Sequence, residues 1–236
     1  MSQTKILSID FDFFQNMKES DVRSYPDGID RTAEQSEKIW SECYAVNKNL
    51  RKITAKQTEL EKLKTILFAQ NPSIPVMIAN SHKKIYDFIC EHQKNRKKLT
   101  VINIDAHHDM FNDNPELDCG NWLSHISEKY KMNLLWIANP TMLDIYGFKD
   151  EDKKIIPINL DGIKNINFDA VFLCRSDTWT PPHLDKHFAK LCGTIKHHFD
   201  EVDMEPNINI PRDVEKKGVN NEYRRLRKEN AGLRRV

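Results

Sequence analysis

The chain has 236 residues, and its 36 Lys and Arg almost balance its 35 Asp and Glu. This length suits one domain with a substantial core. The net charge of +1 provides no overall field that would attract nucleic acid or an anionic membrane. No apolar run approaches the roughly 18 residues that span a bilayer, and no signal-peptide pattern precedes the first predicted strand. We therefore expect a cytoplasmic protein with no membrane partner.

The five cysteines are scattered and lack the C-x-x-C spacing of a zinc knuckle or redox motif. An odd number of them also does not suit a disulfide framework. The sequence therefore predicts free thiols at Cys43, Cys90, Cys119, Cys174 and Cys192.

A β-branched, apolar run at residues 100–104 ends in three potential metal ligands, Asp105, His107 and Asp109. Residues spaced two apart on an extended segment point to one face. Two carboxylates and an imidazole would then converge at a strand end, which is costly unless a cation is present. The alternative is a solvated turn, where Asp is common.

Two other predicted strands end in similar side chains. Residues 5–14 form an apolar run that contains Asp10 and Asp12, and residues 74–79 are followed by His82. Each could be ordinary, because Asp also caps helices and His82 opens a predicted helix. Ligands, however, collect at the carboxyl ends of parallel strands. We therefore predict a metal site formed by Asp10, Asp12, His82, Asp105, His107 and Asp109.

The remaining elements alternate between strand and helix patterns, which is typical of an α/β domain. Residues 33–70 read as two helices, either covering the sheet or forming an excursion from the domain. Further strands are predicted at residues 132–138, 154–159 and 169–174, and a closing helix at 184–199. The composition changes near residue 200. We therefore expect a domain over residues 1–200, with 33–70 as a helical insertion, and a charged, flexible tail over 201–236.

Two other segments carry candidate substrate contacts and a candidate proton shuttle. Asn121 and His125 lie four apart and would share one face of a helix, where a neutral His125 could shuttle protons or simply lie at the surface. After the strand at 169–174, Arg175 could bind a carboxylate and Asp177 an ammonium or guanidinium group. A surface Arg–Asp pair is the alternative. The basic cluster at residues 224–228 could contact nucleic acid, although stacking aromatics are nearly absent there.

Four carboxylates and two imidazoles exceed what one cation needs. Mostly oxygen donors with some nitrogen favour Mn²⁺, with Fe²⁺, Co²⁺ or Zn²⁺ as alternatives. Two ions that share a carboxylate would lower the pKa of a bridging water and provide a nucleophile. Asp109 is then a candidate proton acceptor.

The motifs resemble a known superfamily. Asp-Ala-His-His-Asp at residues 105–109, Ser-Ile-Asp-Phe-Asp at 8–12 and Ser-His at 81–82 look like the three metal motifs of the arginase/agmatinase (ureohydrolase) superfamily, whose fold is shared with histone deacetylases. Gly-Asn-Trp at 120–122 and Trp-Thr-Pro-Pro at 179–182 are closest to an uncharacterised arginase-like family.

The resemblance covers residues 5–14 and about 74–190. It implies a three-layer α/β/α fold with a mainly parallel sheet, a binuclear manganese centre held by the six residues above, and hydrolysis of a non-peptide C–N bond. Three departures stand out. The Ser-x-Asp-x-Asp motif precedes the Asp-x-His-x-Asp motif, which implies a rearranged strand order. Leu123 stands near the place of the histidine that follows Gly-Asn in arginases, with His125 two residues later. Arg175 or Asp177 stands where an acidic guanidinium-binding residue is expected.

Three functions follow from these patterns. The first is a metal-dependent hydrolase that activates water for attack on a guanidino or amide C–N bond of a small molecule, with His125 or a water protonating the leaving nitrogen. The second is a two-metal phosphoesterase, to which the basic tail could bring nucleic acid. The third is a non-catalytic arginase-like binding module. A homo-oligomer is compatible with each of them.

Overall fold

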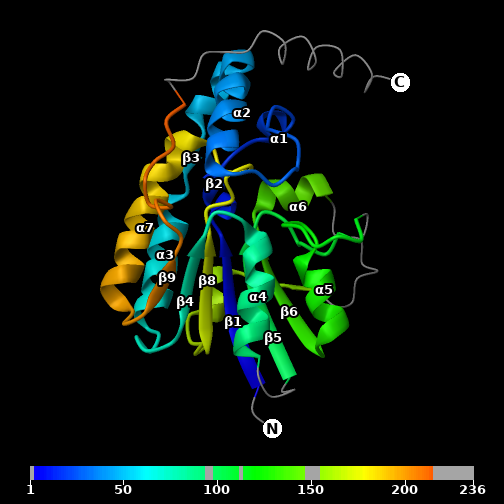
Figure 1. Cartoon of the computed structure of the whole chain (residues 1–236), viewed down its shortest axis with the longest axis vertical. Helices are drawn as coiled ribbons and strands as arrows, with labels where there is room; N and C mark the ends of the chain where they lie inside the picture. Colours follow the sequence, from blue (N-terminus) through cyan, green and yellow to red (C-terminus); the bar gives the residue numbers. More distant parts are fainter. Residues whose placement is uncertain (1–2, 94–97, 112–113, 147–154, 215–236) are drawn as a thin grey trace.

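The computed structural model describes residues 3–93, 98–111, 114–146 and 155–214, whose arrangement is shown in Figure 1. Seven strands of this part form one sheet in the order β7-β6-β5-β1-β8-β4-β9, and all neighbours are parallel. The strands are β1 (Gln3–Asp10), β4 (Val76–Ala79), β5 (Lys98–Asp105), β6 (Met132–Ala138), β7 (Ile155–Pro157), β8 (Ala170–Cys174) and β9 (Val202–Met204). The central strand β1 therefore has β5 on one side and β8 on the other.

Helices cover both faces of this sheet. The α-helices are α1 (Glu19–Val22), α2 (Ala33–Val46), α3 (Gln57–Phe68), α4 (Ile85–His92), α5 (Trp122–Lys129), α6 (Pro140–Tyr146) and α7 (Asp185–His198). The 3-10 helices are η1 (Phe11–Phe14), η2 (Lys48–Lys52), η3 (His82–Lys84), η4 (Leu160–Ile163) and η5 (Pro182–Leu184), and a small ribbon joins β2 (Gln15–Asn16) to β3 (Thr54–Ala55).

Alternation along β1 explains the layers. Ile6 belongs to the cluster beneath α4 and α5, whereas Leu7 belongs to the cluster beneath α3 and α7. Neighbouring residues of a strand point to opposite faces, and a parallel sheet buried on both faces needs continuous apolar runs. The predicted α/β class is confirmed, and the layers are arranged as α/β/α.

The region 33–70 is part of this domain and is no excursion from it. Thr32 caps α2: its Oγ1 accepts a hydrogen bond from the Gln35 N–H, while the Gln35 side chain accepts one from the Thr32 N–H. This is the reciprocal pattern of a capping box. The side chain of Trp40 on α2 is fully buried in the same cluster as Leu63 on α3. In Figure 1, α2 lies beyond the carboxyl end of the sheet, and α3 lies beside α7.

Two predicted boundaries were wrong. The strand expected over residues 5–14 ends at Asp10, because the Asp12 N–H donates to Asp10 Oδ1 (2.9 Å) and the chain turns into η1. The domain also does not stop at residue 200. Strand β9 pairs with β4, and Arg212 is buried. Strand β9 is short, and residues 205–214, here called the strap, are irregular. Neither carries hydrophobic periodicity, so the composition alone predicted a tail. Residues 215–236, including the basic cluster at 224–228, lie outside the described residues.

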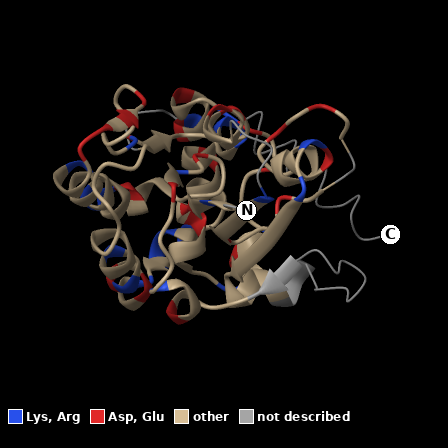
Figure 2. Cartoon of the chain, turned by 90° about the horizontal axis from the view of Figure 1, so that it is seen from below, with Lys and Arg blue, Asp and Glu red and all other residues tan. Residues whose placement is uncertain are grey.

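Basic and acidic residues alternate along the described elements. Figure 2 shows blue and red segments interspersed over the helices and loops. None of the helices in the described part of the chain combines the length and apolarity that crossing a membrane requires.

Candidate metal centre

The carboxyl end of β1 places two carboxylates in the interior. Asp10 is the last residue of β1, and Asp12 lies in the turn that follows. Asp10 Oδ1 accepts the Asp12 N–H, so this residue does cap a helix, as the alternative interpretation proposed. Asp12 Oδ1 in turn accepts the Ala106 N–H from the next strand end (3.1 Å). One oxygen of each carboxylate is thus fixed by backbone, and the other can face a ligand.

The carboxyl end of β5 turns sharply, and it does not continue as the extended segment that the sequence suggested. Strand β5 ends at Asp105, whose Oδ1 accepts the His107 N–H (2.7 Å). Asp109 then adopts a left-handed backbone with φ of 51°. These three side chains converge through a turn stabilised by Asp105 itself. The sequence predicted that these side chains converge because every second residue of an extended segment points to one face. In the structure they converge because the chain turns after Asp105.

His82 enters from a strand that does not touch β1. It follows β4, which β8 separates from β1. The centroid of its ring lies 5.8 Å from that of Phe172, on which it stacks, and 4.9 Å from that of Trp122. Its Nε2 lies 2.7 Å from Ser8 Oγ on β1. When Nε2 carries the proton and donates it to Ser8, Nδ1 presents a lone pair to the cluster, which is how metal-binding histidines are commonly oriented.

Three carboxylates surround that Nδ1 atom. It lies 3.3 Å from Asp10 Oδ2, 3.1 Å from Asp105 Oδ2 and 2.9 Å from Asp109 Oδ2. Asp10, His82 and Asp105 form one group whose ligand atoms lie within 4.8 Å of one another. All of these side chains are buried.

A second group shares one carboxylate with the first. His107 Nδ1 lies 3.1 Å from Asp12 Oδ2 and 3.7 Å from Asp105 Oδ1. Asp12, Asp105 and His107 also meet the 4.8 Å criterion. Asp105 therefore offers one oxygen to each group, and two groups with a shared carboxylate are the pattern of a binuclear centre.

Two buried atoms support a cation here. Within the described residues, His82 Nδ1 and Asp12 Oδ2 have no hydrogen-bond partner of acceptable geometry, although charged groups lie close to both. Buried polar atoms are nearly always hydrogen-bonded, and leaving a charged one unsatisfied is costly. A divalent cation in each of the two groups would satisfy one of these atoms. The residues present therefore fit a metal.

The carboxylates differ in how readily they ionise. Burial, followed by repulsion from Asp12 and Asp105, raises the pKa of Asp10 to about 8. Burial and the charge of Asp105 likewise raise the pKa of Asp109 to about 8. Burial opposes ionisation of Asp105 too, but its contacts with the two imidazoles outweigh it and hold the pKa of Asp105 well below its usual range.

The imidazoles are affected in the opposite sense. Burial disfavours the charged form of His82, yet its contacts with Asp10, Asp105 and Asp109 outweigh this effect and raise its pKa well above the usual value. The pKa of His107 is raised in the same way by Asp105 and Asp12. In the metal-free protein, protons thus supply the positive charge that a cation would otherwise provide, and metal binding must displace them.

A cavity of about 220 Å³ opens onto the cluster. Its metal side is formed by Asp10, His107 and Asp109, and the rest of its lining is Gly28, Phe111, Asp118, Cys119, Gly120, Ser176 and Trp179. The lining combines two aromatic rings with a carboxylate outside the cluster. This volume is smaller than the sites that hold drug-sized ligands, which begin at roughly 300 Å³.

Trp179 forms one wall of this cavity. The centroid of its ring lies 4.5 Å from that of the His107 ring, and a Cβ added at Gly28 would lie 3.2 Å from Trp179 Cζ2. The backbone carbonyl of Trp179 accepts a hydrogen bond from Gln15 Nε2 (2.9 Å). The indole is therefore held between the cluster and the loop around Gly28.

Asn121, a predicted substrate contact, and His125, the predicted proton shuttle, do not line the cavity. Asn121 is buried, and its side chain binds the backbone of residues 114, 116 and 118. It shapes the loop that carries Asp118 and Cys119. His125 lies on α5 with its ring 6.4 Å from Tyr86. Neither residue is among those that line the cavity.

The second pair also lies outside the cavity lining. Arg175 binds Asp177 through Nε (2.5 Å) and Nη2 (3.0 Å), and both side chains are buried. This is an internal ion pair, so neither the substrate contact nor the surface pair that the sequence suggested describes it. The residue between them, Ser176, does line the cavity.

Sequence reasoning missed several groups at this site. Trp122 Nε1 donates to Asp109 Oδ2 (2.6 Å) and orients that carboxylate, and Ser8 orients His82. Trp122 and Trp179 belong to the segments that carry the family resemblance, which was a signal for their importance. Ser8 is the polar interruption in an apolar strand. Nothing in the local sequence marked Asp118 or Cys119.

No protein-family model, no curated protein and no solved structure matches this chain.

Proposed function

We propose that this protein is a metal-dependent hydrolase of the arginase/agmatinase type, which binds two divalent ions and cleaves a C–N bond of a small guanidino or amide compound. One observation carries the proposal: Asp105 belongs to both groups of potential ligands at the cavity. A shared carboxylate is what a pair of closely spaced ions needs. The motif resemblance to ureohydrolases supports the same conclusion.

The donor set favours manganese. Asp10, His82 and Asp105 would hold one ion, and Asp12, Asp105 and His107 the other. Asp109 is close enough to the first group to contribute an oxygen. Carboxylates with imidazoles and no thiolate suit Mn²⁺, with Fe²⁺, Co²⁺ or Zn²⁺ as alternatives. Such a pair of ions, when bound, lowers the pKa of water and provides a nucleophile near neutral pH.

The chain's own groups would orient the reaction. Asp109 lines the cavity with its Oδ2 fixed by the Trp122 indole, so it is placed to accept the proton of the attacking water. The rings of Phe111 and Trp179 would exclude bulk water around the substrate. Asp118 would attract a positively charged group on it. His125 is not needed as the acid, because a water in the cavity can protonate the leaving nitrogen.

The lining argues against the phosphoesterase alternative. Among the described residues, no Lys or Arg lines the cavity, and Asp118 adds a negative charge beyond the cluster. An anionic phosphodiester would have only the ions as counter-charges there. A small neutral or cationic C–N substrate is therefore favoured. The non-catalytic module remains the third candidate, and the metal content of the protein separates it from the other two.

The first experiment is elemental analysis of protein incubated with Mn²⁺ and desalted. We expect about two ions per chain in the wild type and loss of both in Asp105→Asn. His108→Ala is the matched control: His108 is in the same segment, but its Nδ1 accepts the Met110 N–H and it belongs to neither ligand group. It should keep the wild-type metal content. Wild-type protein without bound metal would remove the hydrolase proposal and favour the binding module.

The second experiment separates the two reaction types. Metal-loaded protein is assayed for ammonia or urea release from guanidino and amide compounds and, in parallel, for hydrolysis of bis(4-nitrophenyl) phosphate. C–N turnover that Asp105→Asn abolishes supports the proposal. Phosphodiester turnover that is lost in the same variant, with no C–N activity, would favour the phosphoesterase.

A further inference from the structure

The loop after β8 supplies one wall of the cavity and has a constrained backbone. Ser176 and Trp179 both line the cavity, and Ser176 has φ of 57°, a left-handed conformation that residues with a Cβ seldom adopt. Such conformations persist where the surrounding structure fixes them. The groups that fix this loop therefore determine where the Trp179 wall lies.

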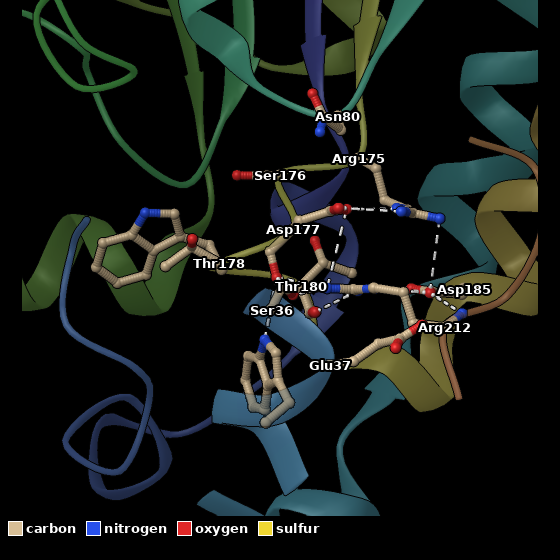
Figure 3. Close-up of polar contacts among 12 residues, drawn as sticks. Ser36, Glu37, Asn80, Arg175, Ser176, Asp177, Thr178, Thr180, Asp185 and Arg212 are labelled. Carbon is tan, nitrogen blue, oxygen red and sulfur yellow. Dashed lines mark hydrogen bonds and ion pairs between the residues drawn. The ribbon is translucent and has the colours of Figure 1, made fainter. Parts of the chain in front are cut away.

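Arg212 is the most extensively bonded of these groups. Its Nε and Nη2 donate to Oδ2 and Oδ1 of Asp185 (2.8 and 2.7 Å). Its Nη1 donates to the Asp177 carbonyl and to Ser36 Oγ (both 2.5 Å), and Nη2 also donates to the Thr180 carbonyl (2.7 Å). A guanidinium has five N–H donors, and each has an acceptor here. Figure 3 shows Arg212 between Ser36, Asp185 and the loop at Thr180.

The same loop holds the strap from which Arg212 comes. Arg175 Nη1 donates to the carbonyls of Ile208 (2.8 Å) and Ile210 (3.1 Å), while its Nε and Nη2 bind Asp177. The two arginines and the two carboxylates, Asp177 and Asp185, are buried and balance in charge. The Arg175–Asp177 pair is drawn in Figure 3. Arg175 therefore binds the loop to the strap, and Arg212 binds the strap to the loop.

We propose that Arg212 is a positioning residue of the metal cavity, which fixes residues 177–180 so that Trp179 forms the wall beside His107. The role concerns the wall itself and goes beyond the proposed hydrolase, because it holds for any substrate of this cavity. Arg212 does not line the cavity; it acts through two backbone carbonyls on either side of Trp179. It comes from the segment that the sequence assigned to a flexible tail.

Lysine cannot replace this arrangement. Its three donors sit on a single nitrogen, whereas the guanidinium spreads five over a planar fork. Arg212→Lys keeps the positive charge beside Asp185 but cannot also reach the carbonyls of Asp177 and Thr180. The variant should therefore retain the fold and the candidate metal ligands, which lie at or just after the carboxyl ends of β1, β4 and β5, and loosen the wall.

Cys119 reports on the wall because it lines the same cavity, while Cys43 and Cys192 are buried in the core. The full chain is labelled with N-ethylmaleimide and the rate at each cysteine is followed by peptide mass spectrometry. In Arg212→Lys we expect Cys119 to react about five-fold faster or more, as in a local opening, with little change at the core cysteines. The control is Ile195→Val, a core variant on α7 that lowers stability generally.

The comparison distinguishes positioning from general stability. An unchanged Cys119 rate in Arg212→Lys would overturn the proposal, and so would a rise at Cys119 matched by Cys43 and Cys192, as in the control. If Arg212→Lys does not fold, Asp185→Asn, which removes one acceptor charge from Arg212, is labelled in its place and judged by the same criteria. Metal content of the same samples is measured separately, so failure of the metal proposal is not confused with failure of this one.

Discussion

The Nδ1 atom of His82 lies 3.1 Å from the Oδ2 atom of Asp105. Asp105 faces the second imidazole, His107, through its other oxygen. Its pKa is held well below the usual range even though burial opposes ionisation. Asp10, a neighbour in the same cluster, has its pKa raised to about 8, mainly by burial. In the metal-free protein, Asp105 is therefore the charged carboxylate and Asp10 is protonated at neutral pH.

This difference predicts unequal stability effects for variants of two candidate metal ligands. In EDTA at pH 7, Asp105→Asn should lower the free energy of unfolding by about 1–3 kcal/mol, because it removes the negative charge that faces two buried imidazolium groups. Asp10→Asn should change it by less than about 0.5 kcal/mol, because an amide resembles a protonated carboxyl group. Urea unfolding measures both. Both variants should lose bound metal, and equal destabilisation by the two would contradict the assigned charges.

The pH dependence of metal binding follows from the same groups. The raised pKa values of Asp10 and Asp109, both about 8, and of His82 mean that the folded, metal-free protein binds more protons than the unfolded chain. The contribution of Asp10 and Asp109 to stability is present at low pH and is lost as the pH rises from about 4 through 8, whereas that of His82 begins to be lost only above its ordinary pKa of 6.5. Binding of the proposed metal ions would release these protons, so it should strengthen over the same range.

The measurable result is a difference in melting temperature. The gain in Tm on adding Mn²⁺ to EDTA-stripped protein should grow from pH 6 to pH 8. Proton release on binding, obtained by calorimetry in buffers of different ionisation enthalpy, is the direct check. His108→Ala serves as the control that keeps the ligand groups. A gain in Tm that does not change with pH would mean that the cluster is already deprotonated without metal.

Much of the fold was predictable because parallel strands buried on both faces need continuous apolar runs. Strand β6 lies where the sequence predicted it, and β8 and α7 differ from the predicted bounds by a residue. The rule that ligands collect at carboxyl ends was enough to group Asp10, His82 and Asp105 from the sequence alone, although β8 separates β4 from β1.

The rest depended on contacts between residues remote in sequence. Arg212 is buried only because carbonyls of residues 177 and 180 and the carboxylate of Asp185 meet it. Its own neighbourhood, rich in Pro and Asn, has no apolar period to indicate burial. Arg175 and Asp177 turned inward for the same reason. Local patterns report local structure, and a buried ion-pair network is decided by its partners.

Ser8 provides a test of how His82 is oriented. Ser8→Ala removes the oxygen 2.7 Å from His82 Nε2, while Nδ1 faces the carboxylates. Loss of such an orienting partner typically costs about 10–100-fold in metal affinity. Competition with a fluorescent chelator measures the Mn²⁺ affinity. We expect one of the two ions to be weakened and the other to be retained.

The control for this variant is Ser41→Ala, which removes a buried hydroxyl on α2 away from the ligand groups. It should leave both affinities unchanged. If Ser8→Ala binds both ions as tightly as the wild type, the hydroxyl does not orient His82 and the assigned tautomer is wrong.

The packing of the cavity wall can be tested at Gly28, which lines the cavity, with Gly193 on α7 as the comparison. A Cβ at Gly193, on the exposed side of α7, would meet no atom within 4 Å, so Gly193→Ala should stabilise the helix by about 0.5–1 kcal/mol and raise Tm by about 2–4 °C. A Cβ at Gly28 would lie 3.2 Å from Trp179 Cζ2, and the same indole also lies against the His107 ring, which limits how far it can shift. Gly28→Ala should therefore raise Tm by less than Gly193→Ala does, or not at all. It should also slow maleimide labelling of Cys119, because the added methyl group narrows the cavity. Equal rises in Tm with unchanged labelling would mean that the loop at Gly28 does not support the Trp179 wall.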